Sequence, residues 1–345
     1  MSNRKDILVF AKRYNVKNPE QIGGAIRLSE ELIDDLQTLK ESFTVIDINP
    51  ANGGGFFLTY IKVIWKTIIQ TKKHNSVLFI GSDRVVVHLA PVVLLIGKLC
   101  NRKVTLKKVG GGFDRFYNES GYLVKLRIRW LMKNVVATLF ETKQLVNYFK
   151  SFGRTVWFPN VRNFPERKII PGAYQKRFAF ISQVKNTKGV IEILEACQIL
   201  GSDYRIHIYG PIVDLVIPDH LKSIFDEIYK GALKPDEVLK TIENYDVIML
   251  PTYYPGEGYP GILIESYSMG KPVISTIWNS IPEIIDHEKT GLLIAPKDKT
   301  ALVEAIEWYN VKNYPILSEN ALNYSKQFNS LYQTSDKLNL IKGNA

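Results

Sequence analysis

Residues 246–296 read DVIMLPTYYPGEGYPGILIESYSMGKPVISTIWNSIPEIIDHEKTGLLIAP, and this stretch decides the fold. An apolar run of strand length, Val247 to Leu250, leads into a loop rich in proline and glycine, Pro251 to Gly261. The segment Ile262 to Met269, which precedes a glycine, predicts a short helix, and Pro272 to Ile277 predicts a second buried strand. This strand–loop–helix–strand order is typical of open α/β sheets, which bind ligands at the carboxyl ends of their strands.

The loop predicts an anion site flanked by two carboxylates. Glu257 lies in the loop and Glu265 in the helix that follows it. The backbone N–H groups between them stand at a helix N-terminus, where unpaired donors and the helix dipole favour a phosphate. Carboxylates are poorly suited to hold an anion, so we expect both to accept hydrogen bonds from hydroxyl groups on either side of it. The residues expected to bind the anion are Gly258, Tyr259, Pro260, Gly261 and Ile262.

Two parts of this stretch resemble a known enzyme family. Glu257-Gly258-Tyr259, followed by Glu265-Ser266-Tyr267-Ser268-Met269-Gly270-Lys271-Pro272-Val273-Ile274, resembles the E-x7-E motif of retaining glycosyltransferases of the GT-B fold, in particular family 4. The later segments Ile281-Pro282-Glu283 and Thr290-Gly291-Leu292-Leu293 also resemble that family. The resemblance implies an α/β protein with two doubly wound, Rossmann-like domains that face each other across a cleft.

The resemblance also implies an activity. A sugar would pass from a nucleotide-diphosphate sugar, with a UDP-sugar as the expected donor, to a glycan or lipid-linked glycan acceptor in cell-surface polysaccharide biosynthesis. Transfer would retain the anomeric configuration and would need no metal and no cofactor. In such an enzyme Glu265 would bind the ribose hydroxyls, and Glu257 would hydrogen-bond to the transferred sugar.

A second segment is expected to neutralise the donor diphosphate. Relatives carry G-R-x4-K-G after the first strand of the second domain. Here Lys188 and Gly189 match that pattern, and Gln183, which stands in place of the arginine, is expected to contact the donor. Lys188 is therefore the expected catalytic cation, and Lys185 is the candidate for the second positive charge.

Three further positions are carried over by the resemblance. Gly210 is expected beside the nucleobase, and Gly24 is expected where the backbone of the first helix approaches the donor, although a tight turn alone would also explain a glycine there. Many relatives place a histidine before the glycine run of residues 110–112, but this chain has Val109. Asp114 is then the candidate side chain for contact with the acceptor.

The expected domain organisation follows the alternation of strands and helices. Residues 1–162 form the acceptor-side domain, residues 163–174 a linker and residues 175–325 the donor-binding domain. A C-terminal helix at about residues 326–345 is expected to pack back on the first domain.

Charge is distributed unevenly along the 345 residues. Residues 1–160 hold 25 Lys and Arg against 12 Asp and Glu, a net charge of +13, whereas the whole chain carries +11. A basic half is consistent with an anionic membrane surface as a further partner.

The polar start of the chain and the absence of a long uncharged apolar run predict no signal peptide and no membrane span. With only two cysteines, we expect a cytoplasmic protein, peripheral on the inner face of the membrane.

Two basic segments allow two interpretations each. Phe56 to Gln70 and Tyr122 to Lys133 show apolar residues at helical spacing, interrupted by lysines and arginines. Either could be a helix that faces the core, or an amphipathic helix that rests in a membrane interface.

Other functions remain open at this stage. Gly256 to Gly261 reads as G-x-G-x-x-G, but no acidic residue ends the next strand, which argues against a dinucleotide site. A nucleotide-sugar epimerase of the same fold, or a donor-binding protein with weak activity, are the alternatives to a transferase. Nucleic-acid binding is disfavoured because the basic residues are interleaved with apolar residues on helices, and the five histidines show no metal-ligand spacing.

Overall fold

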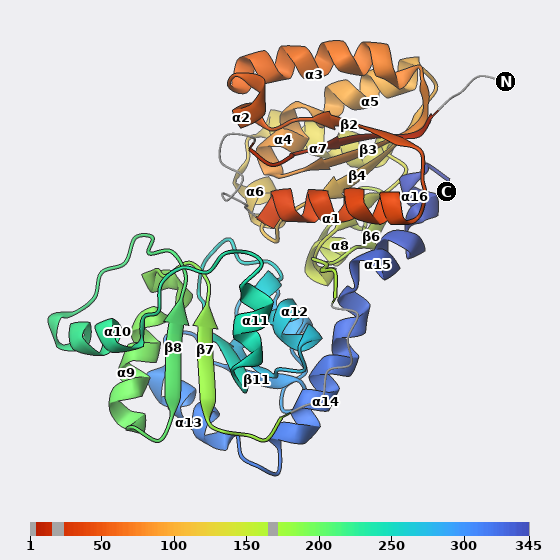
Figure 1. The fold of residues 1–345 in the computed structure, drawn as a ribbon. Coiled ribbons are helices and arrows are strands. Elements are labelled where there is room, and N and C mark those ends of the chain that lie inside the picture. Colours follow the sequence, from red (N-terminus) through yellow and green to blue (C-terminus); the bar gives the residue numbers. More distant parts are fainter. Residues whose placement is uncertain (1–4, 16–23, 165–171, 345) are drawn as a thin grey trace. The chain divides into compact units, whose positions relative to one another are not determined.

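A computed structural model describes residues 5–15, 24–164 and 172–344, and the chain divides into two compact units (Figure 1). The N-terminal unit comprises residues 1–163 and 328–345, and the C-terminal unit comprises residues 164–327. Most of the expected linker, residues 165–171, lies outside the described residues. Each unit is a parallel sheet with helices packed on it, as the sequence predicts.

The N-terminal unit is built on a six-stranded parallel sheet of order β2-β1-β3-β4-β5-β6. The strands β1 and β3 are mostly apolar and buried, which is typical of a parallel sheet covered on both faces. The strands are β1 (Lys5–Ala11), β2 (Phe43–Asp47), β3 (His74–Gly81), β4 (Lys103–Lys108), β5 (Thr138–Phe140) and β6 (Thr155–Trp157).

Helices cover both faces of this sheet and form two separate cores. One core includes Val63, Leu94 and Ile128, from helices on one face, and the other includes Leu32 and Ile341, from helices on the opposite face. The helices are α1 (Gly24–Thr38), α2 (Pro50–Gly53), α3 (Phe56–Thr71), α4 (Asp83–His88), α5 (Ala90–Leu99), α6 (Phe113–Glu119), α7 (Tyr122–Asn134), α8 (Lys143–Phe149), α15 (Ser330–Asp336) and α16 (Leu338–Ile341).

Two helical segments of this unit are divided. Residues 83–99 form α4 and α5 rather than one helix, because Pro91 at the start of α5 cannot donate the backbone hydrogen bond that a continuous helix requires. The expected C-terminal helix divides at Asn329, which is extended and caps α15 by accepting a hydrogen bond from the Tyr332 N–H at 2.9 Å. The α15 segment packs on α1, where Asp35 accepts hydrogen bonds from Ser330 and Thr334.

The C-terminal unit contains a five-stranded parallel sheet of order β11-β10-β9-β7-β8. The strands are β7 (Arg177–Ile181), β8 (Arg205–Tyr209), β9 (Val247–Leu250), β10 (Val273–Thr276) and β11 (Gly291–Ile294). The helices are α9 (Val190–Leu200), α10 (Lys222–Ile228), α11 (Val238–Glu243), α12 (Gly261–Ser268), α13 (Lys299–Trp308) and α14 (Tyr314–Ser325), with short 3-10 turns η1 (Asn186–Lys188), η2 (Asp219–Leu221), η3 (Ile281–Glu283) and η4 (Lys326–Phe328).

The stretch that decides the fold has the predicted order, β9, loop, α12 and β10. Gly270 has a φ of +64° just after α12, which confirms the predicted glycine stop. The helix α11 begins at Val238, beyond Pro235. None of the described helices combines the length and the apolar character needed to cross a bilayer.

Candidate active site

A buried ion pair lies at the carboxyl ends of β7 and β9 in the C-terminal unit. Lys188 ends the turn η1 after β7, and its Nζ pairs with Oε2 of Glu257 in the loop after β9. Both side chains are only 10% exposed. Thr252 donates a hydrogen bond of 3.0 Å to the same carboxylate oxygen. The structure therefore brings together two sequence-predicted residues that are 69 positions apart.

The backbone around Lys188 fixes this arrangement. Gly189 has a φ of +82°, and a Cβ there would come within 2.2 Å of the Pro251 carbonyl oxygen, so only glycine fits. The Thr187 carbonyl accepts a hydrogen bond of 2.9 Å from the Tyr253 N–H. The turn after β7 is thus fastened to the loop after β9, and the ammonium of Lys188 is held in a fixed position.

Tyr254 joins the two lysines that the sequence singled out. The Nζ atoms of Lys185 and Lys188 lie 4.8 Å and 5.1 Å from the centroid of its ring. Such distances allow a cation–π attraction. Gln183 is exposed, two residues beyond the end of β7. Two cations therefore share one aromatic ring beside the buried carboxylate.

The loop before α12 exposes some residues and buries others. Glu265 lies in the second turn of α12 and is 5% exposed, whereas Gly258 and Gly261 are half-buried. Tyr259 is 2% exposed, and its hydroxyl donates a hydrogen bond to Glu283 Oε2. This hydrogen bond anchors the loop to η3, which contains Glu283. The half-buried Ile262 stands at the start of α12, and Pro260 precedes that helix without a side-chain cap.

Two residues after β10 support the loop and were not identified from the sequence. The Nδ2 of Asn279 lies 3.1 Å from the Pro255 carbonyl oxygen and 3.2 Å from that of Glu257. The indole N–H of Trp278 donates to the Tyr254 carbonyl at 2.8 Å. Because β10 runs parallel to β9, its carboxyl end had to lie beside this loop. The order of the strands could therefore have identified Trp278 and Asn279 as neighbours of the loop. The positive φ of Asn279, +46°, could not be predicted from the sequence.

Gly210 has a structural reason to be glycine. Its φ is +139°, and a Cβ would lie 1.7 Å from the Ser182 carbonyl oxygen. Its N–H donates to the Gly231 carbonyl at 2.9 Å. Close packing of the end of β8 therefore requires glycine, and contact with a base stays a prediction.

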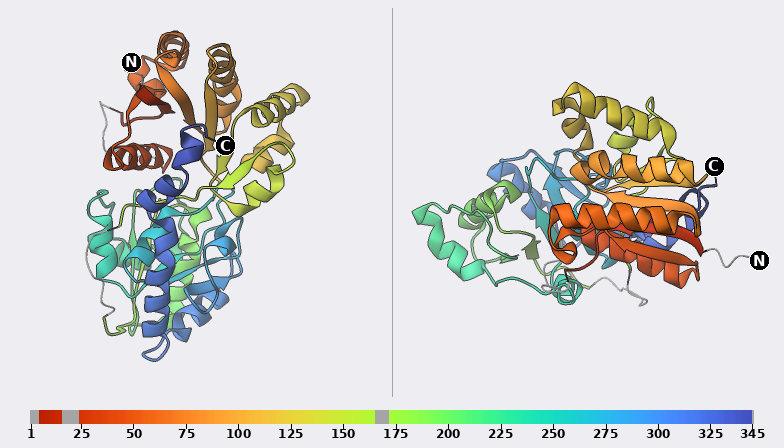
Figure 2. Two further views of the ribbon diagram at one scale, coloured as in Figure 1. Left: turned by 90° about the vertical axis from the view of Figure 1, so that its right-hand side faces the viewer. Right: turned by 90° about the horizontal axis from the view of Figure 1, so that it is seen from above.

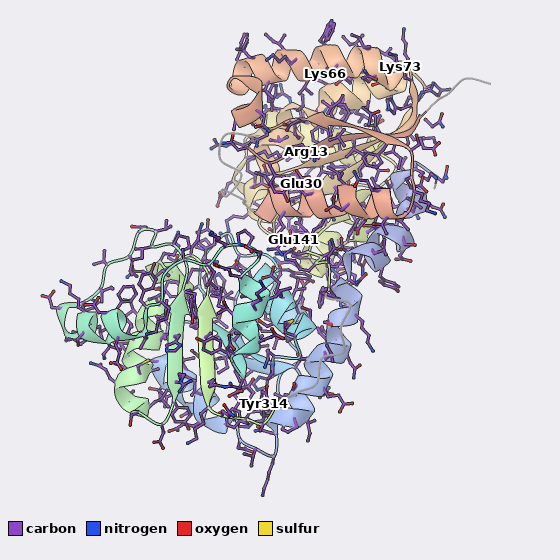
Figure 3. All side chains as sticks on the ribbon, viewed as in Figure 1. Arg13, Glu30, Lys66, Lys73, Glu141 and Tyr314 are labelled. Atoms are coloured by element: carbon purple, nitrogen blue, oxygen red, sulfur yellow. The ribbon has the colours of Figure 1, made fainter. Side chains whose placement is uncertain are left out.

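The remaining predicted residues belong to the N-terminal unit. Asp114 lies half-buried in the first turn of α6, and its Oδ2 accepts a hydrogen bond of 2.9 Å from Gln144 Nε2. Glu141 accepts a hydrogen bond of 3.0 Å from the Gly110 N–H and so fixes the glycine run before α6 (Figure 3). Gly24 is exposed at the start of α1, with open space around the position of a Cβ.

The same unit carries two buried lysines at the end of β4. Lys108 pairs with Asp83 at 2.7 Å, and its Nζ also donates to the Val109 carbonyl at 2.5 Å. The Nζ of Lys107 lies 3.1 Å from the centroid of the Phe158 ring. Burial lowers the pKa of Lys107 to about 7, although Glu141 and Asp35 oppose this by favouring the charged form.

A cavity of about 430 Å³ lies elsewhere in the C-terminal unit. Its lining includes Tyr204 and Arg205, at the amino end of β8, and Cys197. Burial raises the pKa of the Cys197 thiol to about 12, so this thiol is protonated and unreactive at neutral pH. Parallel sheets bind ligands at the opposite, carboxyl end, where Lys188 and Glu257 lie. Among the described residues, no group of three or more His, Cys, Asp or Glu is arranged to hold a metal ion.

Comparison with known proteins relates the C-terminal unit to a family. Residues 175–309, which are 135 of the 345 residues, match the family model of glycosyl transferases group 1. The resemblance seen in the E-x7-E motif is thereby confirmed, and the matched segment contains Lys188, Glu257 and Glu265.

Two sequence relatives carry names from polysaccharide biosynthesis. WcaL of Escherichia coli, named for colanic acid biosynthesis, is 27% identical over 160 residues, which cover 43% of this chain and 39% of WcaL. The amylovoran biosynthesis glycosyltransferase AmsK of Erwinia amylovora is 30% identical over 139 residues, which cover 36% of this chain and 34% of AmsK. The matches thus span less than two fifths of the length of these relatives.

Among solved structures, HepE of Anabaena, crystallised in complex with UDP, has the same fold. The two chains superimpose with a TM-score of 0.71 over 96% of this chain and 98% of HepE, at 14% identity. The similarity of the two folds confirms the predicted GT-B fold class. At 14% identity it is evidence of the fold alone.

Proposed function

We propose that this protein is a retaining glycosyltransferase that moves a sugar from a UDP-sugar to a glycan or lipid-linked glycan. The buried Lys188–Glu257 pair, within the segment that matches the family model of glycosyl transferases group 1, is the observation that carries the proposal. The names of WcaL and AmsK support a role in polysaccharide biosynthesis, and the UDP complex of HepE supports uridine as the base.

Lys188 would neutralise the diphosphate as it leaves. Its ammonium has three N–H donors, of which one is directed at Glu257, so the others can reach phosphate oxygens. Lys185, whose ammonium also lies over the Tyr254 ring, would supply the second positive charge. Relatives have an arginine for this purpose at the position of Gln183. A fixed cation beside developing negative charge lowers the barrier without reorganisation of the site.

The backbone before α12 would complete the phosphate site. The N–H groups of Gly258, Tyr259, Gly261 and Ile262 stand at the positive end of the helix dipole, whereas Pro260 between them has no N–H to donate. Glu265 would accept hydrogen bonds from the ribose hydroxyls, while the second oxygen of Glu257 would accept one from the transferred sugar. Thr252 and Asn279 would hold Glu257 and its loop in that position.

Transfer with retention needs no nucleophile from the protein. The bond from the anomeric carbon to the phosphate oxygen breaks, and the acceptor oxygen forms its bond on the same face. The acceptor proton passes to an oxygen of the departing phosphate, so charge and atoms balance. Asp114, held by Gln144, would contact the acceptor.

Thermal stabilisation by UDP, GDP, ADP and NAD tests this proposal. A ligand at 100 times its dissociation constant adds about 2.7 kcal/mol to the free energy of unfolding. We expect UDP to stabilise the wild type, and the Glu265→Ala variant to lose that effect. The matched control Glu304→Ala, on the exposed side of α13, should keep it. Stabilisation by NAD alone would overturn the proposal.

One observation favours a second candidate, a donor-binding protein with weak activity. Gln183 is exposed and uncharged where relatives carry an arginine. If Lys185 does not replace that charge, UDP should bind, but release of UDP from a UDP-sugar should be slow and unaffected by Lys185→Ala. An epimerase would instead convert the UDP-sugar without releasing UDP.

A further inference from the structure

The helices α3, α5 and α7 form one outer face of the N-terminal unit, which we call the α3–α5–α7 face. α3 packs on α5, and α5 packs on α7 (Figures 1 and 2). Their inner residues Val63, Val93 and Leu131 belong to the same buried core. The outward residues of these helices are therefore neighbours on one surface.

Large apolar side chains project from this face. Phe57 is 74% exposed and Trp65 is 63% exposed on α3, Leu99 is 87% exposed at the end of α5, and Tyr122 is 74% exposed on α7. The full set of exposed large apolar residues on the face is Phe57, Leu58, Ile61, Trp65, Ile68, Ile69, Leu95, Leu99, Tyr122, Leu123, Leu126 and Trp130. Single exposed apolar residues are ordinary, whereas a group of this extent marks an interaction surface.

The same face is strongly basic. The three helices contain no aspartate or glutamate, and their cationic residues are Lys62, Lys66, Lys98, Lys125, Arg127, Arg129 and Lys133. Lys72 and Lys73 follow α3 and are exposed (Lys66 and Lys73 are labelled in Figure 3). Within the described part of the chain, Lys66, Lys73 and Arg127 form no ion pair with a carboxylate. The face thus combines aromatic and aliphatic side chains with uncompensated positive charge.

We propose that the α3–α5–α7 face docks on a lipid bilayer that contains anionic lipids. Tryptophan and tyrosine favour the interface between headgroups and acyl chains, and lysine and arginine near that surface are attracted to anionic headgroups. Long cationic side chains can reach the headgroups while apolar neighbours enter the acyl region.

Two other occupants fit the face less well. In a symmetric dimer the same patch would meet itself, so the lysines and arginines of α3, α5 and α7 would oppose each other, and these helices contribute no carboxylate to offset them. A nucleic acid would satisfy the charge but would leave the leucines and isoleucines without apolar contact. Of these three occupants, an anionic bilayer alone matches both the positive charge and the apolar side chains of the face. The inference rests on this surface and does not depend on the proposed function.

Vesicle sedimentation of the full chain tests the proposal. We expect the wild type to sediment with vesicles of phosphatidylcholine and phosphatidylglycerol, and at least about tenfold less with phosphatidylcholine alone or at 0.5 M salt. The variant Lys66→Glu/Lys73→Glu should reduce binding to the anionic vesicles at least about tenfold. The variant Lys240→Glu/Lys312→Glu, which changes the net charge equally at exposed sites of the C-terminal unit, should stay within about twofold of the wild type.

A second pair of variants tests whether the apolar side chains of the α3–α5–α7 face contribute to vesicle binding. Trp65→Ser/Ile61→Ser should weaken vesicle binding without lowering the melting temperature, because both side chains are exposed. Tyr332→Ser, an equally exposed aromatic site on α15, is the control. Failure to bind anionic vesicles, or equal losses in the two charge variants, would overturn the proposal. So would concentration-dependent dimerisation that Trp65→Ser/Ile61→Ser abolishes, because it would assign the face to a second copy of the chain.

Discussion

Both sheets of this protein end in buried lysines, but the lysines have different surroundings. In the N-terminal unit Lys108 is enclosed by Asp83 and by the backbone carbonyls of Val109 and Gly110. In the C-terminal unit Lys188 pairs with a carboxylate in a glycine-rich loop beside a helix N-terminus. The ammonium of Lys108 makes its contacts with groups of its own unit, which indicates a structural role. We propose that Lys188, beside a helix N-terminus, can bind a ligand instead. Charge and burial alone do not distinguish the two.

The largest effect is expected when Lys188, the lysine proposed to hold the diphosphate, is removed. Lys188→Ala should lower kcat/KM for a UDP-sugar by about 100-fold or more, because the leaving diphosphate loses its fixed cation. UDP release, followed by a coupled assay, measures this rate. Lys299→Ala, an exposed lysine on α13, is the control and should be unchanged. A wild-type rate in Lys188→Ala would place the catalytic cation elsewhere.

The second prediction tests whether Gly189 is required to place Lys188. Gly189→Ala should lower the free energy of unfolding by about 2–4 kcal/mol, because its Cβ would collide with the Pro251 carbonyl and its φ is positive. Urea denaturation measures the loss.

Gly54→Ala provides the matched control for that prediction. Gly54 has a similar left-handed backbone, with φ +86° and ψ +29° against φ +82° and ψ +23° at Gly189, but a Cβ there would make only an ordinary contact of 3.5 Å with the Leu58 side chain. Its loss should be about 1 kcal/mol, the cost of the left-handed conformation alone. Equal losses at the two glycines would show that the contact with Pro251 does not matter.

The third prediction concerns the buried lysine of the N-terminal unit that lies over an aromatic ring. Burial lowers the pKa of Lys107 to about 7, whereas an unfolded lysine titrates at about 10.4. Between these values the unfolded chain binds more protons, so the free energy of unfolding should rise with pH.

The variant Lys107→Met isolates that contribution. The difference in unfolding free energy between wild type and variant should change by a few kcal/mol between pH 7 and pH 10, at about 1.4 kcal/mol per pKa unit. Urea denaturation at several pH values measures it. A difference that is constant over this range would show that Lys107 titrates as in water.

The smallest expected effect concerns the ring shared by Lys185 and Lys188. Tyr254→Leu should weaken UDP binding about two- to fivefold, as expected for a loss of about 0.5–1 kcal/mol of cation–π attraction. Calorimetric titration measures the affinity. Tyr253→Leu is the control, because its ring contacts Lys297 and not the site lysines. Equal changes in the two variants would argue against a role for the ring in ordering the cations.

The sequence predicted the central part of the C-terminal unit because local signals agree there. Apolar runs, a proline-rich loop and a terminal glycine specify β9, α12 and β10. The pairing of Lys188 with Glu257 follows from adjacent parallel strands, β7 and β9. The roles of Thr252 and Asn279 were missed because they depend on loop conformation, which leaves no periodic signal.

The helix α3 shows where periodicity fails. Apolar spacing predicted one stripe, facing either the core or a membrane. The structure exposes Phe57, Ile61, Trp65 and Ile68. Tyr60 and Ile64 of the same stripe are partly buried and pack on the core beside Val63, so the stripe divides between the core and the surface. By contrast, α1 on the opposite face exposes polar residues such as Asp34, and Glu30 pairs with Arg13 at 2.7 Å (Figure 3). A helix that is apolar on most sides does not reveal which side the sheet covers.

Calorimetric titration with UDP and with uridine tests the central claim most directly. If Lys188 holds the donor diphosphate, UDP should bind the wild type more tightly than uridine does. That difference should largely disappear in Lys188→Ala and persist in Lys108→Met, since Lys108 is enclosed by its own unit. A UDP preference that survives in Lys188→Ala, or that is lost equally in both variants, would contradict the account.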